Sequence, residues 1–185
     1  NEIPLRQMNL RPEEAAQVQA YQPLCLKPQL AVLNVGEADI RREEEIMAQL
    51  RPQIEGTGVE LAAACASMEM EISQLEETLA REFMEDLGIE MSALVRLLRV
   101  SYHLLGLISF FTIGDDECRA WTIGKSATAK QAAGAVHSDM ERGFIRADVA
   151  HFKDFITRGN WAACRAEGVM RLEGKEYIVE DGDIM

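Results

Sequence analysis

The chain of 185 residues is long enough for one medium domain or two small ones. Its hydrophobic content of 48%, its 27% charged residues and its net charge of −12 are typical of a soluble globular protein and argue against a general nucleic-acid binder. No apolar run approaches the roughly 18 residues of a membrane span, and the chain starts at Asn1. We therefore expect no signal peptide, no membrane association and a fragment of a longer protein.

The charge is distributed unevenly along the chain. Residues 125–175 contain nine basic and six acidic residues, a local net charge of +3, whereas the remainder contains ten basic and twenty-five acidic residues. This pattern argues against a DNA-binding protein, but it leaves room for one face that contacts RNA phosphates. The alternative is a mixed, solvated surface with no binding role. The four cysteines are widely spaced and predict reduced core thiols and no metal site.

The first half of the chain alternates helical and strand patterns. Arg11-Pro-Glu-Glu14 predicts a helix that ends near Gln22, because Pro and acidic side chains suit the first turn. Residues 29–35 are nearly all apolar and predict a strand that is buried on both faces. A charged helix over 39–51 and a second buried strand over Val59–Ala64 follow.

Two polar segments follow the ends of these strands. The first strand ends in Asn34-Val-Gly-Glu37, and the second precedes Cys65-Ala66-Ser67-Met68-Glu69, which we expect to form a loop. In P-loop NTPases, an Asn and an acidic residue at such a strand end bind the base, and main-chain N–H groups of a second loop flank it. The alternatives are an ordinary turn, with Glu37 opening the next helix, and simple packing of a small residue at Cys65.

Residues 70–105 predict helical structure with a break at Gly88. In the second piece, apolar residues recur at helical spacing and predict a stripe that faces the core. The stripe consists of Leu94, Val95, Leu97, Leu98, Tyr102 and Leu105.

From residue 107 the pattern changes to short strands. Leu107–Ile113 and Cys118–Ile123 flank Gly114-Asp-Asp-Glu117 and predict a hairpin. Gly124-Lys125-Ser126 matches the last three residues of a phosphate-binding loop motif, but that motif requires Gly at the position of Arg119. A loop that enters the next helix explains this segment better.

The last third of the chain predicts a helix, strands and a tight turn. Thr128 and Gln131 have the spacing of a capping box. The helix would direct Ala129, Ala132, Ala133 and Val136 inward. Residues 144–149 and Tyr177–Val179 predict strands, and Glu180–Asp183 predicts a tight turn. Two further helices are predicted over 151–158 and 161–167. This order is that of a small β-grasp, ubiquitin-like module.

The sequence of this region closely resembles the TGS domain of the YchF/Obg-like ATPase family of Obg-related P-loop NTPases. That family places QAAG, a His, GFIRA, and RLEGK, YIV and DGD in the order found here. The resemblance covers nearly the whole chain and implies an α/β part followed by an α+β part. Residues 1–104 would be the base-side remnant of a P-loop NTPase domain with its helices, and residues 105–185 a β-grasp TGS domain.

The resemblance also implies a function. Members are cytoplasmic proteins that hydrolyse ATP or GTP with Mg²⁺ and associate with ribosomes. Asn-x-x-Glu, in place of the usual Asn-Lys-x-Asp, resembles members that accept ATP and implies base contacts from Asn34, Val35, Glu37 and Ala66. The phosphate-binding loop and the magnesium-binding Thr and Asp are missing here, so we expect the fragment to bind no cofactor and to be catalytically silent alone. The sequence does not decide between ATP and GTP.

The TGS resemblance implies a contact with ribosomal RNA or a ribosomal protein. The candidate contacts are Lys125, Lys130, Arg142, Arg146 and Lys153. For Arg146 the alternative is pairing with Asp148 across a solvated strand face. The competing function is a non-catalytic β-grasp module that docks on a ribosomal or other protein partner. A third function, an independent enzyme, lacks support because no paired nucleophile and base is evident.

Overall fold

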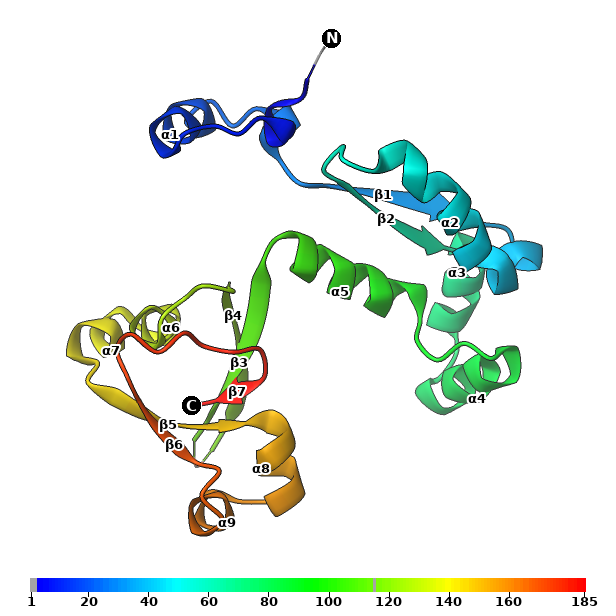
Figure 1. Cartoon of the computed structure of the whole chain (residues 1–185). Coiled ribbons are helices and arrows are strands. Elements are labelled where there is room, and N and C mark those ends of the chain that lie inside the picture. The colour runs from blue at the N-terminus through cyan, green and yellow to red at the C-terminus, as the bar shows by residue number, and fades with distance from the viewer. Residues whose placement is uncertain (1–2, 115) are drawn as a thin grey trace. The chain divides into compact units, whose positions relative to one another are not determined.

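The structure is a computed structural model that describes residues 3–114 and 116–185 (Figure 1). The chain divides into two compact units, Asn1–Leu105 and Gly106–Met185. We call them unit 1 and unit 2 and describe each by itself. None of the helices in the described part of the chain has the length and apolarity that a membrane span requires.

Unit 1 combines two parallel strands with helices. The strands are β1 (Gln29–Asn34) and β2 (Val59–Ala64), and their register pairs Gln29 with Val59 and Asn34 with Ala64. The α-helices are α1 (Pro12–Gln19), α2 (Glu43–Ile54), α3 (Ala66–Gln74), α4 (Glu77–Leu87) and α5 (Ala93–Leu104). Short 3₁₀ helices cover Leu5–Gln7, Leu24–Leu26 and Glu37–Arg42.

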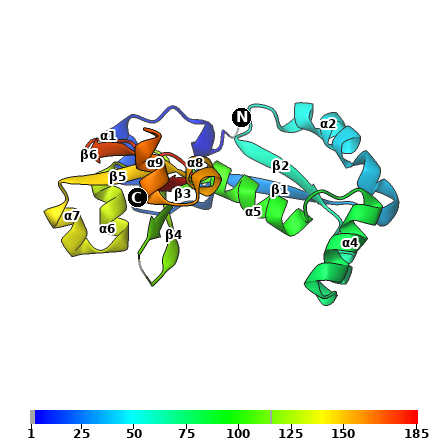
Figure 2. The same ribbon diagram turned by 90° about the horizontal axis from the view of Figure 1, so that it is seen from below.

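The core of unit 1 lies where β1 and β2 meet the helices. Helices α2 and α5 contact β2, and the two strands lie side by side in Figure 2. The buried cluster consists of Val35, Met47, Ala63, Cys65 and Met68. The two predicted strands are therefore confirmed. The charged helix predicted over 39–51 instead consists of the 3₁₀ helix Glu37–Arg42 and α2, which continues to Ile54, and Met47 on its predicted apolar side is buried.

The predicted burial of two apolar segments of unit 1 is wrong. Val32 in the middle of β1 is 48% exposed, and Leu94 and Leu98 of α5 are 61% and 53% exposed. Within the described residues, β1 pairs with β2 alone, so one face and one edge of β1 stay uncovered. Hydrophobic periodicity identifies residues that share a face, but it does not show whether that face is covered.

Two predicted boundaries in unit 1 also differ from the structure. The segment 65–69 is not a loop, because α3 begins at Ala66 and only Cys65 separates it from β2. The helical region after Met70 has a second break at Leu75, where the backbone is extended with ψ of 149°, besides the predicted break at Gly88. Gly88 adopts φ of +70° at the end of α4, a conformation that favours glycine.

Unit 2 is built on five strands in the order β4-β3-β7-β5-β6. They are β3 (Leu107–Ile113), β4 (Cys118–Gly124), β5 (Arg146–His151), β6 (Arg171–Gly174) and β7 (Asp183–Ile184). The helices are α6 (Ala129–Val136), α7 (Ser138–Gly143), α8 (Phe152–Arg158) and α9 (Trp161–Ala166). Strand β7 is parallel to β3 and antiparallel to β5, so it joins the two halves of the sheet. Residue 115 of the predicted hairpin turn lies outside the described residues.

Helix α6 covers the core of unit 2 and begins as predicted. The Thr128 N–H donates to Gln131 Oε1 at 2.8 Å, and the Gln131 N–H donates to Thr128 Oγ1 at 3.3 Å, which completes the capping box. Ala129 and Ala132 have no exposed surface and pack with Phe110 of β3. The small side chains let the helix approach the sheet closely.

Two strand predictions in unit 2 need correction. Strand β5 begins at Arg146 rather than at Phe144, and Ile145 is 75% exposed. The segment Tyr177–Val179 is not a strand of the sheet, because it makes one isolated bridge, between Ile178 and Thr128. Its neighbours instead bond the start of α6, as in the Ala129 N–H that donates to the Tyr177 carbonyl at 2.7 Å.

A buried carboxylate fixes the end of the chain. Asp183 has no exposed surface, and its Oδ2 accepts from the Tyr177 hydroxyl at 2.7 Å and from the Glu180 N–H at 2.9 Å. Arg171 Nη2 lies 3.4 Å from Asp183 Oδ1 and neutralises the charge. Burial, followed by the bond to Asp183, raises the pKa of Tyr177, so the phenol remains a donor. The tight turn at Glu180–Asp183 is confirmed, since the Asp183 N–H donates to the Glu180 carbonyl at 3.1 Å.

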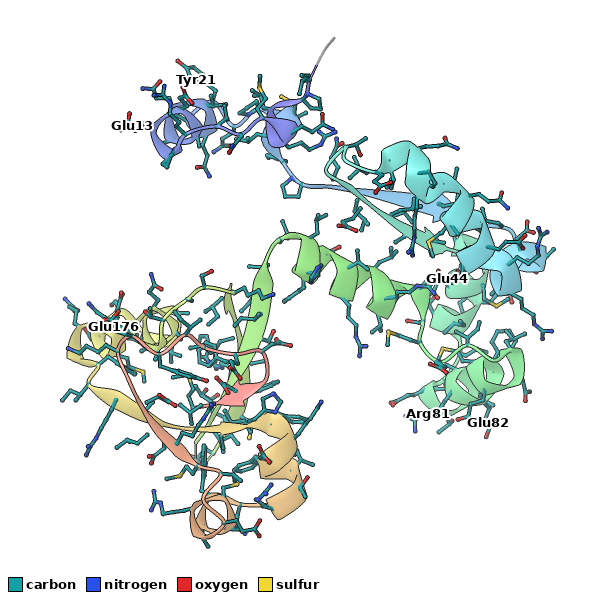
Figure 3. All side chains as sticks on the ribbon, viewed as in Figure 1. Glu13, Tyr21, Glu44, Arg81, Glu82 and Glu176 are labelled. Carbon is teal, nitrogen blue, oxygen red and sulfur yellow. The ribbon has the colours of Figure 1, made fainter. Side chains whose placement is uncertain are left out.

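We predict that Asp183→Ala destabilises unit 2 by about 3 kcal/mol, because Arg171 and the Tyr177 hydroxyl lose a buried partner. Both tryptophans, Trp121 and Trp161, lie in unit 2. Tryptophan fluorescence during urea unfolding therefore measures the stability of this unit. The control is Glu176→Ala, at an exposed position on the outside of unit 2 (Figure 3), and it should leave the transition in place. An unchanged midpoint for Asp183→Ala would contradict this account of the network.

Candidate functional site

Asn34 and Ala66 meet at the carboxyl ends of β1 and β2. Asn34 ends β1, and Ala66 opens α3 two residues after the end of β2. The Ala66 N–H donates to Asn34 Oδ1 at 3.1 Å. With Oδ1 engaged, the Asn34 Nδ2 group carries two donors that have no acceptor among the residues that the structure describes. The sequence separates these residues by 32 positions, and parallel pairing of the strands brings them together.

The other two predicted base-site residues lie on the segment after β1. The Val35 N–H donates to the Ala64 carbonyl at 2.9 Å, and the Val35 side chain is buried in the core of unit 1. Val35 therefore holds the strand end in place. Glu37 opens the 3₁₀ helix Glu37–Arg42 and is exposed. The structure thus places Asn34 and Ala66 in contact, anchors them through Val35, and leaves the Glu37 carboxylate accessible.

An apolar pocket of about 560 Å³ opens beside this pair within unit 1. Asn34, Ala66 and Glu69 supply polar groups at its wall, and the apolar lining comes from Val32, Met70, Leu94 and Leu97. A volume of this size with a few convergent polar groups is typical of small-molecule sites. Sequence reasoning missed the contribution of α5, because it assigned Leu94 and Leu97 to a covered core.

Glu69 connects the site to α5. Its carboxylate accepts from the Ala93 N–H at 2.5 Å and from the Leu94 N–H at 3.2 Å, and it caps the first turn of α5 together with Ser92. One turn further along, Arg96 makes a bidentate pair with Glu43 of α2 and donates to the Ala63 carbonyl at 2.9 Å. The helix start that carries Ala66 is therefore tied to α5 and, through α5, to α2 and β2.

The predicted RNA-contact residues of unit 2 lie on separate elements. They lie after β4 (Lys125), in α6 (Lys130), in α7 (Arg142), in β5 (Arg146) and in α8 (Lys153). The Lys130 N–H donates to the Lys175 carbonyl at 3.4 Å, so the main chains of these two residues are neighbours, and the sequence analysis did not name Lys175. Arg142 pairs with Asp139. Arg146 is the first residue of β5, and Lys153 lies in α8, which follows the other end of that strand.

The alternative for Arg146 is also wrong. Asp148 pairs with Arg165 of α9 at 3.3 Å rather than with Arg146. Successive side chains of a strand point to opposite faces. The half-buried Ala147 and the fully buried Val149 lie on the face of β5 that contacts the core, so Arg146 lies on the opposite face. The guanidinium of Arg146 is exposed.

Two histidines of unit 2 have a role that sequence reasoning missed. His137 Nδ1 accepts from the Asp139 N–H at 3.1 Å, and His151 Nδ1 accepts from the Lys153 N–H at 3.3 Å. Each ring therefore caps the helix that follows it. Across the residues that the structure describes, no group of three His, Cys, Asp or Glu side chains could hold a metal ion.

Comparisons with known proteins place this chain among YchF proteins. Residues 107–185 match the YchF-GTPase_C family, whose description reads "Protein of unknown function (DUF933)". Over 187 residues the chain is 41% identical to the "Ribosome-binding ATPase YchF" of Bacillus subtilis (strain 168), covering 100% of this chain and 51% of that protein. The Escherichia coli O157:H7 protein of the same name is 42% identical and is covered to 50%, with 98% of this chain aligned.

A solved structure agrees with the sequence matches. The "Structure of the Schizosaccharomyces pombe YchF GTPase" superposes with a TM-score of 0.82 at 31% identity, over 98% of this chain and 48% of that one. The chain belongs to the YchF family. It spans about half the length of the YchF proteins that it matches, and its mixed α/β fold is that of the solved YchF structure.

In this YchF chain, we predict that Glu69→Ala frays the start of α5. The Ala93 and Leu94 N–H groups lose their acceptor, which lowers the free energy of local opening by about 1 kcal/mol. Amide hydrogen exchange should accelerate at these two residues. Glu71→Ala, an exposed change two positions along α3, is the control. Equal exchange rates at Ala93 and Leu94 in the variant and the wild type would contradict the capping role.

Proposed function

We propose that this chain supplies the base-binding side of a YchF-type nucleotide site, in a protein that hydrolyses ATP or GTP at full length. The observation that carries the proposal is the contact between Asn34 and the Ala66 N–H at the carboxyl ends of two parallel strands. Ligands of open α/β sheets bind at this edge. The names of the YchF relatives, which describe a ribosome-binding ATPase and a GTPase, support the same function.

The geometry suits recognition of a purine. Asn34 is oriented by Ala66, so its Nδ2 group can donate to an acceptor such as purine N7. The exposed Glu37 carboxylate accepts hydrogen bonds and suits the amino group of adenine or the N–H groups of guanine. Val35 keeps the strand end rigid through its bond to Ala64. Asn34 and Ala66 are therefore the central pair, with Glu37 as the group that selects the base.

Phosphoryl transfer requires parts that this chain does not contain. The 185 residues hold no Gly-x-x-x-x-Gly-Lys-Ser/Thr motif, and Arg119 stands where such a motif would require its first Gly before Gly124-Lys125-Ser126. Catalysis of phosphoryl transfer depends on a phosphate cradle and bound Mg²⁺. The proposal therefore assigns the phosphates and Mg²⁺ to the other half of a full-length YchF protein. The chain alone would bind no nucleotide stably and would be catalytically silent.

The base site can be tested in the full-length protein by calorimetric titration with ATP. Asn34→Ala should weaken ATP binding by about 1 kcal/mol, roughly fivefold in Kd, because a hydrogen bond to the base is lost. Asn34→Asp should also weaken binding, because it retains the acceptor for Ala66 and removes the Nδ2 donors. Asn9→Ala, at an exposed position of unit 1, is the matched control. Wild-type affinity in both Asn34 variants would remove Asn34 from the site.

The second part of the proposal assigns unit 2 to ribosome binding as a TGS domain of the β-grasp type in a cytoplasmic protein. The local charge of +3 over residues 125–175 supports contact with RNA phosphates. Lys130 and Arg146 are exposed and form no ion pair with any residue in the described ranges, so their charges are available to a ligand.

Ribosome co-sedimentation of the full-length protein tests this part. Reversing both charges with Lys130→Glu and Arg146→Glu should reduce the bound fraction and flatten its salt dependence, because phosphate contacts release counterions. Lys27→Glu in unit 1 is the control, and it matches the change of charge of each single reversal. ATP affinity should be unaffected in all variants. A bound fraction that changes neither with salt concentration nor in the double variant would argue against an electrostatic contact with RNA.

A further inference from the structure

Arg96 of α5 contacts both of the segments that carry the proposed base contacts. Its guanidinium forms two hydrogen bonds with the carboxylate of Glu43, and its Nη2 also donates to the Ala63 carbonyl at 2.9 Å. Glu43 opens α2 directly after the 3₁₀ helix that Glu37 begins. Ala63 lies in β2, three residues before Ala66. One side chain therefore joins the Glu37 segment to the Ala66 segment.

Two further hydrogen bonds connect the strand ends, but they act before Glu37. The Val35 N–H donates to the Ala64 carbonyl, and the Ala66 N–H donates to the Asn34 side chain. Both bonds fix residues at the end of β1. Glu37 follows on the 3₁₀ helix and is exposed. The bond that Arg96 makes to Glu43 holds the other end of this helix, so it controls a position that the strand pairing leaves open.

Apolar packing beside the 3₁₀ helix is incomplete. Ile40 of this helix is partly buried against the core of unit 1. A cavity of about 430 Å³ opens next to it, and Glu43, Met68 and Arg96 also line this cavity. Close packing would by itself fix the spacing of two elements. Where the packing is interrupted, the directional hydrogen bonds of Arg96 set the position of the 3₁₀ helix.

Stability alone does not explain the arrangement of this ion pair. The side chains of Arg96 and Glu43 are 38% and 13% exposed, so both charges are partly removed from water. The Arg96 Nε is buried and has no acceptor among the residues that the structure describes. An unpaired buried donor destabilises a fold, and a buried ion pair is weak evidence for stability. A planar guanidinium with two parallel bonds does fix the orientation of its partner.

We propose that Arg96 is a positioning residue of the base site, which holds the Glu37 carboxylate at the distance from Asn34 and Ala66 that a purine requires. This inference rests on the proposed nucleotide site and names a residue that acts on it from outside. Arg96 does not touch the base. Its loss therefore weakens binding through Glu37, and the contacts with the phosphates are unaffected.

Calorimetric titration of the full-length protein with ATP and GTP tests this role. Glu43→Met/Arg96→Met removes both charges together, because the loss of one partner alone would leave a buried charge unpaired. It should weaken binding of the tighter-binding nucleotide roughly fivefold, the effect of losing one hydrogen bond to the base. Arg96→Lys keeps the charge without the planar fork and should show the same loss. Arg99→Met, at an exposed position one turn further along α5, is the matched control and should bind as the wild type does.

Two readouts separate a positioning role from a general loss of structure. Inorganic tripolyphosphate with Mg²⁺ has no base, so its affinity should be the same in the Glu43→Met/Arg96→Met variant and the wild type. In a Glu37→Ala background, the same double change should cost no further nucleotide affinity, because the group that Arg96 positions is absent. Equal losses with and without Glu37, a parallel loss of tripolyphosphate binding, or wild-type nucleotide affinity in the double variant would overturn the proposal.

Asn34→Ala, titrated in parallel, distinguishes failure of this inference from failure of the nucleotide site. Weaker binding in Asn34→Ala, together with wild-type affinity in the Glu43→Met/Arg96→Met variant, would overturn the positioning role alone. Wild-type affinity in both variants would overturn the base site as well.

Discussion

The fold of unit 2 depends on one buried carboxylate. Strand β7 has only two residues, yet it is the sole link between the β3–β4 pair and the β5–β6 pair in the strand order of the described residues. A strand of that length makes few ladder bonds, so other interactions must hold it in the sheet. Asp183 provides them through Tyr177, Arg171 and the Glu180 N–H. A buried charge is stable only when it is paired and hydrogen-bonded, and here each requirement is met by the segment that precedes β7.

The same interaction orders the segment between β6 and β7. The Tyr177 hydroxyl donates to the Asp183 carboxylate, and the Tyr177 carbonyl accepts from the Ala129 N–H at the start of α6. The Val179 N–H then donates to the Ala127 carbonyl at 3.1 Å. The start of α6, which the Thr128 capping box also fixes, is thereby attached to the chain end. Unit 1 has an analogous centre, in which Asn34, Ala66 and Glu69 connect two strand ends to α3 and α5.

Local signals in the sequence predicted much of this arrangement. The capping box at Thr128 and Gln131 needs only neighbouring residues, and the apolar runs of β1 and β2 suffice to identify them as strands. The Leu75 break has no glycine or proline to mark it, so it was missed. Tyr177–Val179 has strand composition, but its main chain pairs with Thr128 and Ala129 at the start of α6, which a local pattern does not indicate. Val32 and Leu94 are exposed although both belong to apolar patterns. Such a pattern shows which residues share a face, but it does not show whether another element packs on that face.

The candidate site was predictable in its residues and not in its geometry. The strand-end position of Asn34 follows from the sequence, whereas its bond to Ala66 depends on the parallel register of β1 and β2. The cations of unit 2 could be named from composition, but only the fold shows that Lys130 adjoins Lys175 and that Asp148 pairs with Arg165. Contacts of this kind arise from tertiary structure, which local patterns do not encode.

The central claim is that this chain contains the base side of a nucleotide site and lacks the phosphate side. Phosphate release from ATP, measured in parallel for the full-length protein and for the 185-residue chain, tests it most directly. The account predicts Mg²⁺-dependent release by the full-length protein and release at the buffer rate by the chain alone, because phosphoryl transfer requires a phosphate cradle and a metal. Phosphate release by the purified chain alone, above the buffer rate, would contradict it.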